Sequence, residues 1–251
     1  MNRATHYGDG IFETLRIANG KVCFATAHYA RMLHGATVLG LENAILFSEH
    51  NFNSYLQEYI QRHALINARV RMQLSRVGAM GYACDSQKTE LSISHEPLAT
   101  ATYSINTTPY IYGVYTNNYK TCTELSTIKT TSALLYVLAG NYALANNYNE
   151  TLLLNEQGNV AEGYKSNVFI VKDNVLLTPP LPQGALNGVM RKVILNTCAK
   201  HNIPYAETSL SLSNISSANE IWFTNVIQGI CCASTTNGLA SQMLGYINAE
   251  L

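Results

Sequence analysis

Charged residues are scarce in this chain of 251 residues. Lysine, arginine, aspartate and glutamate make up 13% of it, against roughly 25% in an average soluble domain. Sixteen basic and sixteen acidic residues balance to a formal net charge of zero, so no excess of basic charge points to nucleic acid or to a membrane surface. With 47% hydrophobic residues, the chain can bury one large or two modest cores. Its low charge also leaves surface that subunits could bury between them.

Other absences exclude further classes of protein. No apolar run approaches the roughly 20 residues of a membrane span, and the start, MNRATHYGDG, has no apolar signal region. The seven histidines show neither HxxxH nor HxH spacing, so we expect no metal site. None of the six cysteines forms a CxxC pair. Free, buried thiols in a reducing cytoplasm are the simplest interpretation.

The hydrophobic pattern predicts mixed α and β structure in two domains, 1–98 and 103–251, separated at a proline-containing stretch rich in small polar residues. Alternating segments predict strands, and apolar residues at helical spacing predict amphipathic helices. In chain order these are a hairpin at 10–25, helices at 26–41 and 48–65, strands at 68–77 and 89–98, a helix at 134–148, short strands within 151–181, a helix at 186–202 and a strand or two at 220–234.

A single lysine, Lys129, stands at the edge of an apolar run in STIKTTSALLYVLAG. After it the chain carries no charge until Glu150, whereas a surface helix normally interleaves lysines with glutamates. A desolvated lysine has a lowered pKa and can become a nucleophile. Lys129 is therefore a candidate Schiff-base lysine. The alternative is a lysine at a helix start whose stem lies along the surface.

Glu162 is the candidate acid for the ring nitrogen of a Schiff-base cofactor. It lies in GNVAEGYKSNVFIV, on a strand otherwise made of small and apolar residues. A carboxylate buried there needs a partner, and a protonated pyridine nitrogen would be one. The alternative is an exposed strand end paired with Lys165.

A phosphate site is suggested by PQGALNGVMRK, where a glycine precedes a predicted helix. Backbone N–H groups and the helix dipole at such an N-terminus suit phosphate. Gly188, Val189 and Met190 would supply the amides, unless the helix is an ordinary one capped by Asn187. Arg31, in HYARML, could add a cationic contact, with plain surface solvation as the alternative.

Five spaced motifs in this order resemble the fold-type IV family of pyridoxal-phosphate enzymes, which contains branched-chain and D-amino acid aminotransferases and aminodeoxychorismate lyases. They run from Asn2 to about Ser234: YGDGIFETLRI with AHYARM, IKTTSALLYVLA, LLLNEQGNVAEGYKSNVFIV, LLTPPLPQGALNGVMR and EIWFTNVIQGI. The resemblance implies an N-terminal α/β sandwich domain at 1–98 and a barrel-like α/β domain at 103–251 that carries the Schiff-base lysine. It also implies pyridoxal 5'-phosphate as cofactor and a homodimer.

The resemblance also implies roles for individual residues. Lys129 stands at the position of the family's Schiff-base lysine. It would also act as the general acid–base that moves the proton of the substrate α-carbon. Glu162 stands at the acid that pairs with the pyridine nitrogen. The phosphate contacts would be Arg31, the turn of Gly188, Val189 and Met190, and the last turn at Asn225 and Val226.

The sequence leaves the reaction open. Three motifs look more like those of the lyases: NRATHYGDG, LNGVMR and TNV. In TNV, Asn225 and Val226 offer the phosphate no threonine hydroxyl, whereas the aminotransferases usually have Gly-Thr at this turn. Against this, Met80 stands about where the lyases carry an additional arginine, which a dianionic substrate derived from chorismate would need. We therefore expect a pyridoxal-phosphate-dependent aminotransferase acting on a small α-amino acid, with 4-amino-4-deoxychorismate lyase as the alternative. A pyridoxal-phosphate-binding protein without this catalysis is a third possibility.

Two further residues are candidates for substrate contact. Thr14 would sit near the lysine in either branch of the family. Arg76 could bind a substrate carboxylate, or could be an ordinary residue on a strand surface. The family usually has a short strand before NRATHYGDG, so either the natural start lies upstream or the first domain lacks an edge strand.

Overall fold

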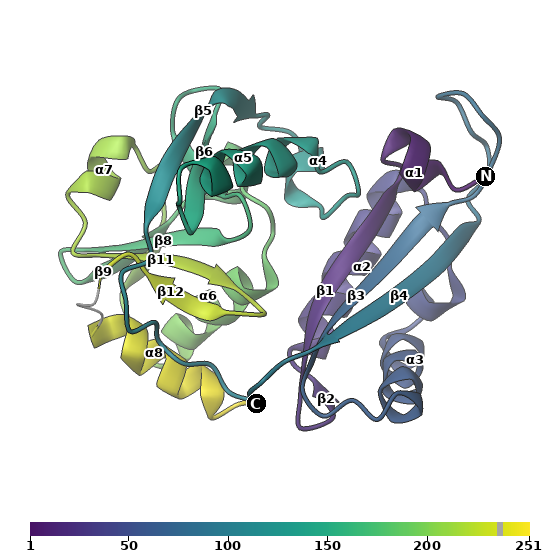
Figure 1. Ribbon diagram of the computed structural model, residues 1–251, viewed down its shortest axis with the longest axis horizontal. Helices are drawn as coiled ribbons and strands as arrows, with labels where there is room; N and C mark the ends of the chain where they lie inside the picture. Colours follow the sequence, from purple (N-terminus) through teal and green to yellow (C-terminus); the bar gives the residue numbers. More distant parts are fainter. Residues whose placement is uncertain (235–237) are drawn as a thin grey trace. The chain divides into compact units, whose positions relative to one another are not determined.

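The computed structural model describes residues 1–234 and 238–251. The chain forms two compact units, the first made of 1–102, 128–133 and 251, the second of 103–127 and 134–250 (Figure 1). The expected domain bounds stay a prediction, but the place of Lys129 needs a correction. The sequence analysis puts Lys129 in the second domain, whereas the short segment 128–133 belongs to the first unit, because its backbone hydrogen-bonds to the strand that begins at Gly10.

The first unit is an antiparallel sheet with two helices on one face (Figure 1). Its strands pair in the order β2-β1-β3-β4. Apolar residues alternate along β1 and β3 and pack with α2 and α3 in one core, as the period of two in a half-buried sheet requires. The elements are α1 (Arg3–Tyr7), β1 (Gly10–Ala18), β2 (Lys21–Val22), α2 (Ala25–Leu39), η1 (Ala44–Leu46), α3 (Glu49–Arg62), β3 (Ala68–Arg76) and β4 (Thr89–Pro97).

The second unit contains two sheets, ordered β5-β6-β7 and β10-β9-β8-β11-β12. Strands β5 and β6 are parallel, and helix α5 lies on the connection between them. Helices α6 and α8 pack on each other and against the five-stranded sheet. The elements are β5 (Tyr112–Lys120), α4 (Glu124–Thr127), α5 (Leu134–Ala145), β6 (Glu150–Asn155), β7 (Val160–Gly163), β8 (Asn167–Lys172), β9 (Val175–Thr178), η2 (Leu181–Gln183), α6 (Val189–Lys200), β10 (Tyr205–Glu207), α7 (Leu212–Ser216), β11 (Glu220–Asn225), β12 (Gly229–Cys232) and α8 (Gly238–Asn248).

Strands β6 and β7 are buried along their whole length. A strand covered on both faces reads as a continuous apolar run instead of an alternating one, as in TLLL of β6. Any acid on such a strand is withdrawn from water and needs a partner inside the protein. This local architecture puts Glu162 and Glu150 in the interior of the second unit.

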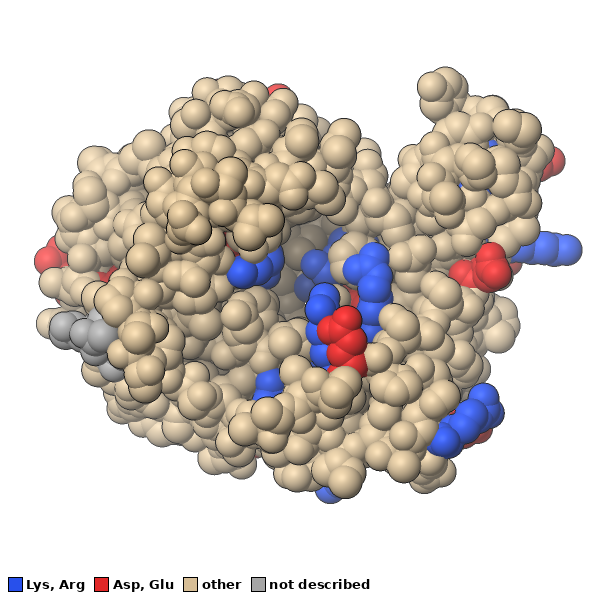
Figure 2. Space-filling model, viewed as in Figure 1, with Lys and Arg blue, Asp and Glu red and all other residues tan. Residues whose placement is uncertain are grey.

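The surface is poor in charge, in keeping with the composition. Most of the face seen in Figure 2 is uncharged, with lysine, arginine and acidic side chains in small, separate groups. Among the described residues, no helix combines the length and the apolar character that crossing a membrane requires.

Candidate active site

Lys129 lies on an extended segment that runs beside β1, between helices α4 and α5. Its carbonyl oxygen accepts a hydrogen bond from the amide of Phe12 at 3.0 Å, and the amide of Thr131 donates to the carbonyl oxygen of Gly10 at 2.9 Å. The ammonium Nζ lies 4.7 Å from the centroid of the Phe12 ring. The lysine is therefore not at a helix start, and backbone pairing fixes the origin of its side chain.

The face of β1 that points away from α2 and α3 carries Phe12 and Thr14, because Ile11, Glu13 and Leu15 point into the unit. Thr14 pairs with Arg71 across the strands, and the guanidinium carbon of Arg71 lies 3.7 Å from the Phe12 ring centroid. Partial burial, and then the charge of Arg69, lower the pKa of Arg71. Two cations, Arg71 and Lys129, thus contact one aromatic ring on the face that carries Thr14.

Arg31 is buried against Glu13 beneath this sheet. Its Nε donates to Glu13 Oε1 at 2.7 Å and its Nη2 to Glu13 Oε2 at 2.5 Å. Burial alone would raise the pKa of Glu13, but the charge and hydrogen bonds of Arg31, and then of His28, lower it to about 2. Arg31 is therefore not the solvated surface residue that the alternative proposed. Its phosphate role stays a prediction.

His28 completes this cluster from helix α2. Its Nδ1 lies 2.7 Å from Glu13 Oε2. Burial lowers the pKa of His28 more than Glu13 raises it, and the charges of Arg31 and Lys129 lower it further. The ring is therefore neutral at pH 7, so Glu13 and Arg31 form the charged pair of this core.

Arg76 has a structural position that the sequence did not reveal. Its Nε donates to both carboxylate oxygens of Asp9, and its remaining nitrogens donate to the carbonyl oxygens of Leu39, Gly40 and Ser86. These bonds tie β3 to the end of α2 and to the loop before β4. A substrate role for Arg76 stays a prediction, and the geometry favours Arg71 for it.

Glu162 is buried on β7 and surrounded by three donors. Lys120 Nζ forms an ion pair with its Oε1, Tyr136 Oη donates to Oε1 at 2.6 Å, and the amide of Leu186 donates to Oε2 at 3.0 Å. The expected alternative, an exposed end held by Lys165, is wrong, because Lys165 Nζ lies 5.0 Å from the Tyr164 ring centroid instead.

Helix α6 begins directly after Gly188, which is its N-cap. Asn187 is thus not the cap, and glycine has no side chain that could bind the first amides of the helix. A Cβ at Gly188 would collide with the Oδ1 of Asn167, whose Nδ2 donates to the carbonyl oxygen of Thr224 at 2.8 Å. The first N–H groups of any helix lack partners within the helix, so this end can bind an anion.

The turn after β11 lies beside this helix end, since Asn167 contacts both Gly188 and Thr224. Asn225 Oδ1 accepts hydrogen bonds from the amides of Ile227 at 3.0 Å and Gln228 at 2.9 Å. The Val226 carbonyl oxygen accepts one from Tyr103 Oη at 2.7 Å. The second unit thus brings together Glu162, the start of α6 and the 225–228 turn through direct contacts.

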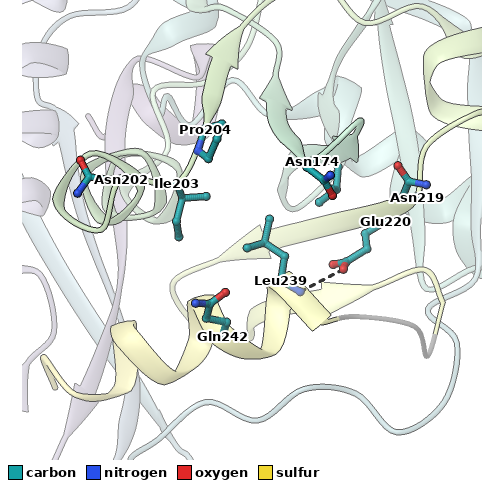
Figure 3. A pocket seen from close by; sticks show the side chains of 9 residues that line it. Asn174, Asn202, Ile203, Pro204, Asn219, Glu220, Leu239 and Gln242 are labelled. Atoms are coloured by element: carbon teal, nitrogen blue, oxygen red, sulfur yellow. Dashed lines mark hydrogen bonds between the residues drawn. The ribbon is translucent and has the colours of Figure 1, made fainter.

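A separate hollow of about 520 Å³ opens between α8, the end of α6 and the edge of the five-stranded sheet. Figure 3 shows Asn174, Asn202, Gln242 and Glu220 around it. Glu220 Oε1 accepts a hydrogen bond from the amide of Leu239 at 3.2 Å, at the start of α8. Glu220 therefore caps helix α8, and the residues that line the hollow include no other acidic or basic side chain. The hollow is thus a weaker candidate for an active site than the residues described above.

Sequence reasoning missed Lys120, Tyr136, Arg71 and Asn167. A signal existed for Lys120, since it is the only charged residue between Glu96 and Glu124, which is the same isolation that marked Lys129. The others look like ordinary strand and helix residues, and only tertiary contacts distinguish them. Among the described residues, no group of three or more histidine, cysteine or acidic side chains could hold a metal ion.

The model of the family described as "Amino-transferase class IV" matches residues 10–234. The chain belongs to the class IV aminotransferases. Two curated relatives are a D-alanine aminotransferase of Staphylococcus aureus (strain N315), 27% identical over 226 residues with 88% of this chain and 77% of that protein covered, and a putative branched-chain-amino-acid aminotransferase of Methanocaldococcus jannaschii, 26% identical with 98% and 85% covered.

Solved structures share the fold. A putative 4-amino-4-deoxychorismate lyase from Legionella pneumophila superposes with a TM-score of 0.90, at 24% identity and with 99% of this chain and 93% of that chain covered. The branched-chain aminotransferase from Escherichia coli gives 0.86, at 22% identity and 100% and 88% coverage. A hypothetical aminotransferase from Mycobacterium tuberculosis, in a form bound to pyridoxal phosphate, gives 0.80, at 17% identity and 98% and 91% coverage. The predicted fold-type IV architecture is confirmed.

Class IV aminotransferases are pyridoxal-phosphate enzymes, so the predicted cofactor is confirmed at the level of the family. Each unit, taken by itself, carries groups whose chemistry matches parts of that molecule. The first unit has the amine of Lys129, which suits an aldehyde, and the second has the carboxylate of Glu162 and the anion site at the start of α6.

Proposed function

We propose that this class IV enzyme is a pyridoxal-phosphate-dependent aminotransferase acting on a small α-amino acid. The observation that carries the proposal is the hydrogen bond from the amide of Leu186, two residues before the N-cap of α6, to the buried Glu162, because it puts a buried acid on the segment that leads into an anion site. Both curated relatives described above carry aminotransferase names.

Each proposed residue has a stated task. Lys129 would hold the cofactor through Nζ and would also move the proton of the substrate α-carbon. Glu162 would bind the ring nitrogen, and the amides of Val189 and Met190 would bind the phosphate. Pyridoxal phosphate would supply an electron-accepting ring that stabilises negative charge on the α-carbon.

Arg71 and Thr14 are proposed as substrate contacts. Arg71 is a partly buried cation next to the ring that Lys129 also contacts, so a substrate carboxylate bound to it lies on the same face of the sheet as the reactive amine. A guanidinium suits a carboxylate because it donates two parallel hydrogen bonds. Arg31, Asn225 and Val226 are proposed as further phosphate contacts.

The second candidate is 4-amino-4-deoxychorismate lyase, in which pyruvate leaves and 4-aminobenzoate forms. Asn225 and Val226 favour it, because neither gives the 225–228 turn a hydroxyl side chain. Met80, exposed in the loop before β4, counts against it, since it puts an apolar side chain where a dianionic substrate would need a cation.

The decisive experiment is a visible absorption spectrum with pyridoxal phosphate, before and after addition of L- and D-amino acids, with Lys129→Ala as control. The aminotransferase proposal expects the band of lysine-bound cofactor in the wild type alone, and its loss with one amino acid as the pyridoxamine form appears. A band that no amino acid changes favours the lyase, which pyruvate release from aminodeoxychorismate then tests. Absence of any Lys129-dependent band contradicts both.

A homodimer in the cytoplasm completes the proposal. Helix α5 exposes an apolar face that comprises Leu134, Val137, Leu138 and Leu144, the last 79% exposed. Such a face is typical of an interface between subunits. The six cysteines are free, which fits a reducing compartment.

A further inference from the structure

Tyr103 is the first segment residue of the second unit, and its backbone is bound to the last residue of helix α8. Its amide donates to Oδ1 of Asn248 at 2.8 Å, and Nδ2 of Asn248 donates to its carbonyl oxygen at 2.9 Å. Two bonds to one carboxamide fix the position and the direction of the backbone here. The side chain of Tyr103 therefore starts from a fixed point, although the residue lies in neither a helix nor a strand.

The buried side chain of Tyr103 contacts the turn that follows β11. Its Oη donates to the carbonyl oxygen of Val226 at 2.7 Å. Its ring lies against Gly229, where a Cβ would come within 2.8 Å of two ring carbons and where the φ of +75° also favours glycine. The ring and the end of the 225–228 turn thus pack closely, and a side chain at position 229 would displace one of them.

One peptide group of this turn is fixed at both ends. Its carbonyl belongs to Val226 and is bound by Tyr103, and its N–H belongs to Ile227 and donates to Oδ1 of Asn225 at 3.0 Å. Because the peptide group is planar, bonds at both ends hold the orientation of the whole plane. The same Oδ1 accepts from the amide of Gln228 at 2.9 Å. Of the amides of residues 226–228, these two bonds leave that of Val226 for a ligand.

We propose that Tyr103 is a positioning residue for the phosphate of pyridoxal phosphate. By holding the carbonyl of Val226 it orients the 225–228 turn, so that the amide of Val226 is aimed before the ligand arrives. That amide lies between β11, which ends at Asn225, and the fixed peptide group. The inference rests on the proposed function, in which Val226 is a phosphate contact, and adds to it a residue that does not touch the ligand.

Preorganisation explains why a distant hydroxyl should affect affinity. A donor that is already fixed loses little conformational freedom when it binds, so less of the binding energy is spent on ordering the turn. Without the hydroxyl, the peptide group of Val226 and Ile227 is held at one end only. The cost should appear for a ligand that carries a phosphate and be absent for one that lacks it.

The test compares pyridoxal phosphate with pyridoxal, which lacks the phosphate group. Both are titrated into wild type and Tyr103→Phe, and their dissociation constants are measured by equilibrium dialysis. Phenylalanine keeps the ring against Gly229 and removes the hydrogen bond to Val226. We expect the preference for pyridoxal phosphate over pyridoxal to fall about fivefold in Tyr103→Phe, the loss that one neutral hydrogen bond gives. An unchanged preference, or an equal loss for both ligands, overturns the inference.

Tyr115→Phe is the matched control. Tyr115 is also a buried tyrosine of the second unit, and its Oη accepts a hydrogen bond from Nδ2 of Asn118 at 3.0 Å. Removing this hydroxyl should leave the ligand preference at the wild-type value. A fall equal to that of Tyr103→Phe would mean that general destabilisation is the cause, and would also overturn the inference. If Tyr103→Phe does not fold, Asn248→Ala, which frees the backbone of Tyr103, takes its place in the same comparison.

A spectroscopic measurement provides a second readout. The phosphorus-31 chemical shift of bound pyridoxal phosphate reports the surroundings of the phosphate, and it should move in Tyr103→Phe and stay in place in Tyr115→Phe. A shift that stays in place in both variants contradicts the inference. Failure of the proposed function looks different, because pyridoxal phosphate then does not bind to wild type in a Lys129-dependent manner. Failure of the inference alone leaves that binding intact and the ligand preference constant.

Discussion

The guanidinium of Arg31 binds both carboxylate oxygens of Glu13, with Nε–Oε1 and Nη2–Oε2 distances of 2.7 and 2.5 Å, in the core between α2 and the sheet. Removing one partner of a buried pair leaves an uncompensated charge and costs about 3–5 kcal/mol. We expect Glu13→Gln to lower the free energy of unfolding by that amount at pH 7, measured by urea denaturation. A loss below about 1 kcal/mol, the size typical of a surface ion pair, would contradict the buried pairing.

The same pair predicts a pH dependence in acid. The pKa of Glu13 is lowered from 4.5 to about 2 in the folded protein, so its stabilising effect is present above pH 4.5 and is lost as the pH falls toward 2. Denaturation curves at several pH values should show this loss in wild type. The free energy of unfolding of Glu13→Gln should change less over the same pH interval.

The buried carboxyl of Glu150 predicts that stability falls, instead of rises, as the pH increases above 4.5. Burial raises its pKa from 4.5 to about 7, more than its hydrogen bonds from Ser166 and Thr151 lower it. The folded state therefore holds this proton more firmly than the unfolded state, and stability falls as the pH rises from 4.5 to 7, by on the order of 3 kcal/mol. Glu150→Gln should be more stable than wild type at pH 8. Equal slopes in the two proteins would refute this assignment.

Gly188→Ala tests the anion site at the start of α6. Its new methyl group would collide with Asn167, so either the helix start or Asn167 must move. We expect at least a tenfold weaker affinity for pyridoxal phosphate, measured by fluorescence titration. Gly238→Ala is the matched control, because Gly238 also begins a helix and a Cβ there meets nothing within 4 Å. Its affinity should equal that of wild type.

Arg71 and Arg76 should behave differently when replaced by glutamine. Arg71→Gln should raise KM for the amino acid about tenfold or more with unchanged cofactor affinity, since a charged hydrogen bond is worth about 1.5–3 kcal/mol. Arg76→Gln should lower the thermal midpoint, because Asp9 and three carbonyl oxygens lose their donor. Steady-state kinetics and thermal denaturation of both variants test this. A KM effect confined to Arg76→Gln would reverse the assignment.

The exposed face of α5 predicts a subunit interface. Leu144→Glu puts a charge on it and should shift the protein toward monomer in sedimentation velocity at micromolar concentration, because burying an unpaired carboxylate is costly. Phe47→Glu is the control, since Phe47 is 75% exposed in the first unit and no interface is proposed there. A monomeric wild type would contradict the homodimer.

Local signals predicted most elements of the fold. The hairpin, the two helices of the first unit and the strands around Glu162 follow from apolar periodicity and turn residues, which act within a few residues of the chain. The glycine at the start of α6 could also be predicted from the sequence, because a helix start is a local feature. These are the features for which short-range physics and the final structure agree.

The ion-pair and hydrogen-bond partners of the predicted residues could not be predicted from the sequence. The alternative interpretation of Glu162 paired it with Lys165, three residues away, but its ion pair is with Lys120, which comes from another strand. Arg76 was a candidate for binding a substrate carboxylate, yet carbonyl oxygens from two separate segments and the carboxylate of Asp9 surround it. Such pairings are decided by the tertiary fold, and single-sequence patterns carry no information on it.

The segment that holds Lys129 has a consequence for the order in which the protein is made. Residues 128–133 complete the first unit, yet the ribosome adds them only after residues 103–127, which belong to the second unit. A nascent chain that ends at residue 102 thus leaves the amide of Phe12 and the carbonyl oxygen of Gly10 without the partners that this segment later supplies. Lys129 therefore joins the first unit only after residues 1–127 have been made, so its place beside β1 reports that synthesis has proceeded into the second unit.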